Sequence, residues 1–336
     1  MSAASATGVG PTSVAPSAAR RRGGPLLRYI ARRLAYAVLV VVAAYAITFA
    51  LLWWLPSDPV RIMLGGQGDA GTVDPQVVAD LTAKYGFDQP PPIQFLTMLG
   101  NALQGDLGVS IDDGRPVAER IAQVLPHTLQ LGVVSLVLGF GLGIGIGLLA
   151  NLPRSRRLRG LLFSLPPLVG SLPSFLIGLL LIQVFAYGLS ALPAVGNDGI
   201  DHLILPAIAL AVPTSAGIAQ VTARALDESV KAAYSDYLRA KGISRRRIIL
   251  RHSLRNAIIP ATTLIGLSVG SILAGAVVTE TVFTRQGFGR LMQEAVTQQD
   301  IPVVQGIVLL CALLYAVVNL LTDLVYPLID PRVTLR

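Results

Sequence analysis

Residues that could support nucleophilic or metal chemistry are few in this sequence. Gly266 to Gly270 match the G-x-S-x-G pattern of serine hydrolases, with Ser268 at the centre. The pattern lies within an apolar run, so we interpret it as a helix-packing face. The chain has three dispersed histidines and one cysteine: His127, His202, His252 and Cys311. We therefore expect neither a metal site nor a disulfide framework, and Cys311 to be a packing residue.

The sequence also lacks a motif for binding nucleotide phosphates. The sequence contains no G-x-x-x-x-G-K-[ST], the loop that cradles the phosphates of ATP. If ATP drives this protein, a partner binds it, and we expect this chain to be no enzyme and to hold no cofactor.

One long cationic segment, Asp227–Pro260, lies between apolar runs. Its first half has helical periodicity, Gly242 can end that helix in the left-handed conformation, and Ser244 can cap a second one. The second helix begins with Arg245, Arg246 and Arg247, the unfavourable sign for a helix N-terminus. This misfit suggests an acidic partner.

Apolar side chains are interspersed among these arginines, and we expect them to be exposed: Tyr234, Tyr237, Ile243 and Ile249. Aromatic and aliphatic anchors flanked by Arg are typical of a protein–protein contact. Binding of the arginines to anionic lipid headgroups is the main alternative, and a solvated loop is the simplest one.

The composition indicates a polytopic membrane protein. The 336 residues are 53% hydrophobic and only 14% charged, and the mean hydropathy is +0.63. A net charge of +8 would suggest nucleic-acid binding in a soluble protein. Six of the 27 Lys and Arg fall outside and the other 21 inside, so the positive-inside rule explains the excess and argues against nucleic acid. The outer six are Arg61, Lys84, Arg115, Arg120, Arg285 and Arg290.

We predict an all-α fold with six transmembrane helices and both termini inside. The first span is expected to be uncleaved, because its apolar run is too long for a signal peptide. The predicted spans are Leu34–Leu55, Leu129–Leu149, Leu161–Leu189, Leu203–Val221, Ile258–Val282 and Val303–Leu328.

The chain divides accordingly into a disordered cytosolic leader (1–28), a first transmembrane helix (29–55), an extracytoplasmic helical segment (56–126), a five-helix membrane core (127–330) and a cytosolic tail (331–336). Three short helices are expected in the outer segment: Asp74–Gly86, Pro92–Gln104 and Pro116–Leu125. Pro126 should then redirect the chain into the second span.

Within the core, glycines at two-residue steps predict close helix packing: Gly139, Gly141, Gly143, Gly145 and Gly147. Pro166, Pro167 and Pro173 should kink the third span. Polar residues in or near spans are candidates for lining or gating a solute path: Gln183, Thr214, Ser268, Ser271, Thr279 and Glu280. Interhelical hydrogen bonding is the alternative for the small ones.

Several motifs together resemble the permeases of the dipeptide/oligopeptide/nickel family of ABC importers, from about Leu27 to the C-terminus. Arg239-Ala240-Lys241-Gly242 and the basic residues up to Pro260 are similar to that family's cytoplasmic EAA loop. The other matching stretches are Leu55–Pro59, Gly105–Ser110, Thr279–Phe283, Gly287–Gly289 and Asp330–Arg332. Two departures are Ser57 in place of Gly, and Ser235-Asp236 where related loops have a more basic run.

The resemblance implies the MetI-like fold of a type I ABC importer permease in the bacterial inner membrane, with both termini cytoplasmic. It implies a second, similar permease, two P-loop ATPases that bind ATP-Mg, an extracytoplasmic binding lipoprotein and surrounding lipid as partners. Peptides are the implied cargo, with nickel, glutathione or another small solute as the alternative. A self-sufficient secondary transporter is the competing function.

By the same resemblance, residues 225–257 form a coupling loop that seats in an ATPase and moves the membrane helices. The residues implied for this contact are Tyr234, Asp236, Tyr237, Arg239, Ala240, Lys241, Gly242, Ile243, Ser244, Arg245, Arg246 and Arg247.

Overall fold

The structure, a computed structural model, describes residues 23–54, 76, 79, 82 and 88–329. These residues form helices joined by turns, as predicted, and contain no strand beyond an isolated bridge between Val109 and Pro116. Most of the predicted helix Asp74–Gly86, most of the leader and the tail 331–336 lie outside the described residues, and the three described residues of that helix, Gln76, Ala79 and Thr82, are helical.

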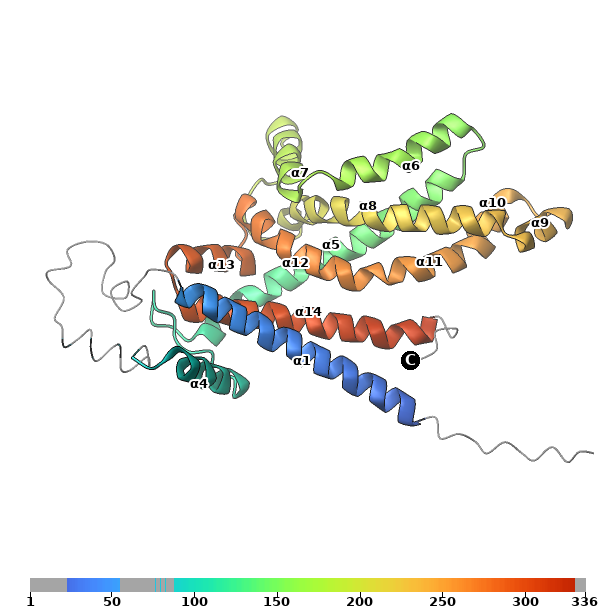
Figure 1. Cartoon of the computed structure of the whole chain (residues 1–336). Helices are drawn as coiled ribbons and strands as arrows, with labels where there is room; N and C mark the ends of the chain where they lie inside the picture. Colours follow the sequence, from blue (N-terminus) through green and yellow to red (C-terminus); the bar gives the residue numbers. More distant parts are fainter. Residues whose placement is uncertain (1–22, 55–75, 77–78, 80–81, 83–87, 330–336) are drawn as a thin grey trace, which may run out of the picture.

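The helices run in a simple order along the chain (Figure 1). The first half contains α1 (Gly23–Trp53), α4 (Pro91–Leu103), α5 (Val117–Asn151), α6 (Arg156–Gly170), α7 (Ser174–Leu181) and the π-helix η1 (Ile182–Gly188). The second half contains α8 (Asp201–Lys231), α9 (Ala233–Ala240), α10 (Arg245–Arg247), the π-helix η2 (Ile248–Ser253), α11 (Leu254–Thr262), α12 (Leu264–Val282), α13 (Phe288–Thr297) and α14 (Ile301–Ile329).

Five helices are long and apolar enough to cross a membrane: α1, α5, α8, α12 and α14. The pair formed by α6 and the continuous α7–η1 helix adds a sixth span if it crosses as one unit, although it is bent by 98°. Six is the number predicted. The start of α1 and the end of α14 lie towards the same end of the molecule as α9 and α10, while α4 and α13 lie towards the other (Figure 1).

The first helix begins before the predicted first span, although its membrane-spanning part starts at Ile30, and the fifth span begins later than predicted. The helix α1 already begins at Gly23, so residues 23–28 are helical rather than part of a disordered leader. Pro25 is compatible with this start because the first turn of a helix needs no backbone N–H donor. The fifth span begins at Leu264, since α11 ends at Thr262 and a turn separates it from α12.

Pro126 does not redirect the chain, contrary to the prediction. It lies inside α5, which runs unbroken from Val117 to Asn151. Proline removes one hydrogen bond, but the helix around it is held by packing: Val117 and Ile121 are buried against side chains of α13 and α14. The boundary between the outer segment and the core therefore falls before Val117, at Pro116.

Of the three prolines predicted to kink the third span, only Pro173 lies at the bend. Pro166 and Pro167 lie within α6, whereas Pro173 precedes α7 and marks the sharp bend. Pro173 has an extended ψ of 141°, and its fixed φ suits the residue just before a helix.

The helix α5 packs along α8 through a row of glycines spaced four residues apart. At each of them a Cβ would approach a backbone carbonyl oxygen of α8 within 3.2 Å or less. Such short distances leave room only for hydrogen, so the two backbones approach closely and Cα–H···O contacts follow. The pairs are Gly139 with Ala211 (3.2 Å), Gly143 with Ser215 (2.9 Å) and Gly147 with Ala219 (3.0 Å).

The remaining two glycines of the predicted series do not take part in this contact. A Cβ at Gly141 or Gly145 would meet nothing within 4 Å. Residues two positions apart lie about 200° apart around a helix, on nearly opposite sides. A glycine at every second position therefore places alternate glycines on two faces, of which only one packs against α8. The close packing predicted from this motif is thus confirmed for one face only.

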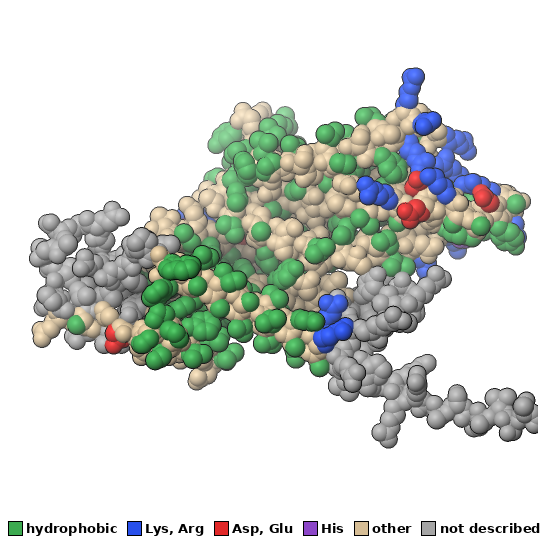
Figure 2. Space-filling view, viewed as in Figure 1, with side chains coloured by type: hydrophobic (Ala, Val, Ile, Leu, Met, Phe, Trp, Pro, Cys, Tyr) green, Lys and Arg blue, Asp and Glu red, His purple; other side chains and the backbone are tan. Residues whose placement is uncertain are grey.

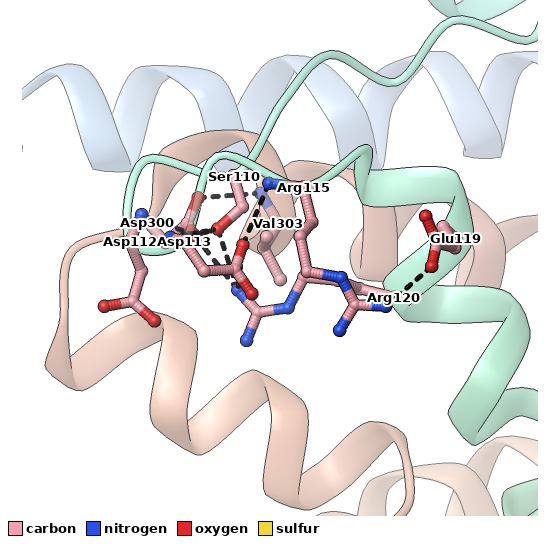
Figure 3. A network of polar contacts seen from close by, with 8 residues as sticks. All are labelled: Ser110, Asp112, Asp113, Arg115, Glu119, Arg120, Asp300 and Val303. Atoms are coloured by element: carbon pink, nitrogen blue, oxygen red, sulfur yellow. Dashed lines mark hydrogen bonds and ion pairs between the residues drawn. The ribbon is translucent and has the colours of Figure 1, made fainter.

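At the outer end, α4 packs on α1 and the loop after α4 is tied to α14. The Phe95 ring of α4 contacts the rings of Tyr45 and Phe49 of α1, with centroids 5.9 and 5.5 Å apart. The loop is held by Asp300, just before α14, whose buried carboxylate accepts a hydrogen bond from the Ser110 hydroxyl at 2.5 Å (Figure 3). Arg120 lies 3.5 Å from the same carboxylate and donates to Ser110.

The glycine row generates a paired prediction. Changing Gly143 to Ala forces a methyl group against Ile218 Cβ (2.6 Å) and the Ser215 carbonyl oxygen, which should lower the free energy of unfolding by about 1–3 kcal/mol. The control Gly145→Ala adds the same methyl group where space is open and improves helix propensity. Thermal unfolding of the purified variants in detergent measures both. Equal melting temperatures would contradict the close contact.

Candidate functional site

The predicted coupling loop, residues 225–257, starts within the last two turns of α8, which ends at Lys231. The chain turns at Ala232, whose ψ is 149°, and α9 follows at once. Ser235 is fully buried and its hydroxyl donates to the Ser229 carbonyl oxygen at 2.8 Å, while Arg239 donates to the Val230 carbonyl oxygen at 3.1 Å. Arg239 and Ser235 thus add hydrogen bonds to carbonyl groups in the last turn of α8, where the Ser229 oxygen also accepts the Ala232 N–H at 3.4 Å. Sequence reasoning missed this role of Ser235, although a Ser at a helix junction is a recognisable signal.

Gly242 ends α9 as predicted. Its φ is +80°, its N–H donates to the Arg239 carbonyl oxygen at 2.9 Å, and the Ile243 N–H donates to the Leu238 carbonyl oxygen at 3.1 Å. These two bonds define a Schellman motif, which fixes the direction in which the chain leaves the helix. Ser244 occupies the N-cap position of α10, but its side chain makes no capping hydrogen bond.

The exposed face of the coupling loop differs in part from the prediction. Tyr237 is 60% exposed, with the Lys241 ammonium 4.6 Å from its ring centroid, and Tyr234 is 37% exposed. Asp236 is exposed and pairs with Arg239 at 3.0 Å. The remaining exposed residues of the predicted contact set are Ala240, Lys241, Gly242, Ser244, Arg246 and Arg247.

Ile249 is buried, so the prediction that it is exposed is wrong. It is 0% exposed and packs with Leu226 and Val230 of α8 and Ala257 of α11. The cause is the π-helical turn η2, which changes the helical phase and buries both Ile248 and Ile249. Ile243 is half-buried.

Positive charge is concentrated around this loop. Figure 2 shows Lys and Arg side chains gathered at the end of the molecule that carries α9, α10 and the start of α6, with few acidic side chains among them. Burial lowers the pKa of the Arg245 guanidinium, and the charges of Arg159, Arg239 and Arg154 lower it further. Only Asp227 opposes them. The loop thus carries cations whose mutual repulsion an acidic surface would relieve.

Asn151 joins the coupling loop to the membrane helices. It lies one turn after Gly147 in the same row of α5, is buried, and its amide nitrogen donates to the Ala223 carbonyl oxygen of α8 at 3.0 Å. Its side-chain oxygen accepts from Arg159 of α6 at 3.4 Å, and its backbone carbonyl accepts from Arg245 of α10 at 3.2 Å. Four helices thus meet at one residue, and Arg245 places a cation at the negative end of α5.

A cavity of about 380 Å³ opens between α8 and α12 in the membrane region. Three predicted path residues line it together: Thr214, Ser268 and Ser271. The rest of its lining is almost entirely apolar, so the few hydroxyl groups are the polar contacts available there. Gln183 is exposed on η1 and does not line this cavity.

The hydrolase alternative has no support in this geometry. Gly266 and Gly270 face α14, where a Cβ would stand 2.6 Å from the Asn319 side-chain oxygen and 2.9 Å from the Tyr315 ring. The motif is therefore a packing face, as interpreted from the sequence. No histidine lines the cavity beside Ser268. Among the described residues no group of His, Cys, Asp and Glu could hold a metal ion, and Cys311 packs partly buried against the core of α13 and α14.

Thr279 and Glu280 are buried at the outer end of α12 and do not line the cavity. The Glu280 carboxylate is 0% exposed and accepts the Gly289 N–H at 2.6 Å and the Thr128 hydroxyl at 2.7 Å. Thr128 in turn accepts the Phe288 N–H at 2.8 Å. Together they satisfy the first N–H groups of α13, where the helix dipole favours an anion. A gating role for either residue stays a prediction.

These features define a class: a helical membrane protein whose spans are joined at one end by an exposed cationic loop. Residues 143–335 match the family model described as binding-protein-dependent transport system inner membrane component, and residues 26–132 match the corresponding N-terminal model. The chain belongs to this family. It is a multi-pass inner-membrane permease subunit of an ABC importer, and ATPase and binding-protein partners are general to that class.

Particular relatives cover nearly the whole chain. The glutathione transport system permease proteins of Escherichia coli K12 and Salmonella typhimurium LT2 are each 36% identical over 308 residues, which span 92% of this chain and 99% of theirs. The fold is similar to the inward-facing MetNI methionine ABC transporter, with TM-score 0.52 and 16% identity over 63% of this chain and 96% of that one.

The Glu280 cluster can be tested with a change that preserves shape. Thr128→Val should leave the Phe288 N–H and one Glu280 oxygen unpaired and lower the free energy of unfolding by about 1–3 kcal/mol. Thr281→Val is the control, because the exposed Thr281 hydroxyl bonds only to its own helix at Val277. Thermal unfolding in detergent compares the two variants. A similar loss of stability in both would refute the role of the Thr128 hydroxyl in holding Glu280 and the start of α13.

Proposed function

We propose that this chain is one of two different permease subunits of an importer for short peptides, glutathione being one of them. The proposal rests on its family and on relatives whose names state glutathione transport. A binding lipoprotein would deliver the cargo on the outside, and two cytoplasmic ATPases would bind ATP-Mg. Both termini are proposed to be cytoplasmic, because the start of α1 and the end of α14 lie towards the end of the molecule that carries the cationic coupling loop (Figure 1).

The observation that carries the proposal is the structure of the coupling loop. Its exposed face combines an aromatic ring, Tyr237, with the charges of Arg246 and Arg247, while its interior is held by the Schellman motif and by Ser235. A rigid segment with an aromatic anchor and unopposed cations suits a grooved, acidic protein surface. We assign that surface to an ATPase subunit.

Movement of the loop would reach the membrane through Asn151. Arg245 links α10 to the end of α5, and the glycine row links α5 to α8, which lines the cavity. Since packed helices shift as units rather than deforming continuously, displacement of the loop should move α5 and α8 together. Thr214, Ser268 and Ser271 would then contact the cargo as the cavity changes its opening.

Uptake by the assembled transporter tests both the function and the lever. The complex of this chain with its second permease, ATPases and binding protein should accumulate radiolabelled glutathione or glycylglycine in vesicles when ATP is present. Gly242→Val places a β-branched residue at a φ of +80°, at a cost of about 1–2 kcal/mol. The transporter assembled with this variant should hydrolyse ATP without taking up solute.

Gly199→Val is the matched control, because Gly199 has a φ of +81° and open space around it, yet lies away from the coupling loop. It should leave the ratio of ATP hydrolysed to solute transported unchanged. Normal coupling in Gly242→Val would refute the lever. Ion-driven uptake by this chain alone would instead establish a secondary transporter.

Charge reversal tests the docking surface. The double change Arg246→Glu, Arg247→Glu should weaken the binding of the ATPases about tenfold or more, equivalent to ~1.4 kcal/mol, because exposed cations would become anions facing an acidic surface. Wild-type binding should weaken as salt is raised. The measurement is the amount of ATPase that co-purifies with the permease at several salt concentrations.

The control makes the same change in charge at Arg156 and Arg157, which are exposed at the start of α6. It should retain the ATPases. An intact complex combined with loss of binding to anionic vesicles in the Arg246, Arg247 variant would favour the lipid-headgroup alternative.

A further inference from the structure

A second cavity lies at the outer end of the molecule, away from the one between α8 and α12. Its volume is about 250 Å³, and the two cavities share no lining residue. It is enclosed by α1, α4, the loop after α4 and α14. The lining residues are Tyr45, Met98, Asn101, Asp106, Leu107, Gly108, Val109, Pro302, Gln305 and Gly306.

Gln305 is the unusual member of this lining. It is 1% exposed, and neither its amide nitrogen nor its amide oxygen has a hydrogen-bond partner among the described residues. Leaving a buried donor or acceptor unpaired costs about 1–3 kcal/mol, so a buried amide with both unpaired requires an explanation. A bound ligand that presents an acceptor and a donor side by side would satisfy both atoms.

The charged residues of the lining limit the kind of ligand that the cavity can bind. The lining contains no Lys or Arg, and Asp106 contributes a carboxylate, so a phosphate or an anionic lipid headgroup would be repelled. An ammonium group would be attracted to Asp106, while an amide group, which has both a donor and an acceptor, matches Gln305. Apolar walls from Met98, Leu107 and Pro302 would exclude water around them.

One wall of this cavity is held in place before any ligand binds. The loop that carries Leu107 and Val109 is tied to α14 through Ser110 and Asp300, and Arg120 reinforces that contact (Figure 3). The Asp106 carboxylate also accepts the Gly108 N–H at 2.9 Å, which fixes its orientation. A preorganised site loses less entropy on binding.

We propose that this outer cavity binds a small solute carrying an ammonium group and an amide group, of the size of an amino-acid amide or dipeptide. Its volume corresponds to about eight water molecules at ~30 Å³ each, enough for such a solute. The site is separate from the transport route. It does not depend on the proposed cargo, since it follows from the groups in this cavity alone.

Equilibrium binding of radiolabelled glycylglycine to the purified transporter, without its binding protein, tests the proposal. Gln305→Met keeps the side-chain length but removes both hydrogen-bonding atoms, and should weaken binding about tenfold or more. Gln293→Met is the control, because Gln293 is exposed on α13. The Gln293→Met variant should bind glycylglycine with the same affinity as the wild type.

A second variant covers the case in which Gln305→Met fails to assemble. Asp106→Asn can keep the hydrogen bond to Gly108 but removes the charge, so it should weaken the binding of glycylglycine and should not weaken that of N-acetylglycine, which has no ammonium group and whose carboxylate Asp106 repels. Absence of glycylglycine binding to the wild type, together with a higher melting temperature of Gln305→Met, would show that the cavity holds only water and overturn the proposal. Equal binding by Gln305→Met and wild type would overturn it as well. ATP-driven uptake would be retained in either case, so the proposed function would stand.

Discussion

The close packing of α5 on α8 is the contact on which the rest of the structure depends. Every fourth residue of α5 lies against a carbonyl oxygen of α8, first through three glycines and then through Asn151. In lipid there is little hydrophobic drive to associate helices, so close backbone approach and interhelical hydrogen bonds supply the attraction. The same row of α5 thus begins as a packing surface and ends as a polar junction beside the coupling loop.

Polar groups are placed at the two ends of this helix pair, where they connect it to other elements. At the outer end Thr128 of α5 joins Glu280 and the first N–H groups of α13. At the inner end Asn151 joins α6, α8 and α10. Hydrogen bonds in a medium of low dielectric constant are costly to break, so both junctions favour motion of whole helices over local bending. This behaviour suits a subunit that receives force from outside itself.

The polar groups of the membrane cavity suit the binding of a solute. The hydroxyl groups of Thr214, Ser268 and Ser271 can contact a solute but lack a neighbouring base in the cavity lining. The sequence encodes no phosphate-binding loop. Under the proposed function, energy enters through a contact with a partner, for which the coupling loop has the rigidity, the aromatic anchor and the excess of positive charge. Membership of an ABC importer family agrees with this division of labour between subunits.

The sequence by itself determined the all-α fold, the number of spans, the helix stop at Gly242 and the cationic loop, because hydropathy, glycine and charge act locally. It determined the importer class through motifs spread over the whole chain. Tertiary structure alone decided which glycines face α8, why Pro126 leaves α5 unbroken, and that Ile249 is buried, since each depends on the neighbour that a helix meets. It also decided that Glu280 lies against α13 and that Asn151, Arg159 and Arg245 meet. Contacts between residues nearly 100 positions apart leave no periodic signal in a single sequence, because they are set by how helices pack and not by local preference.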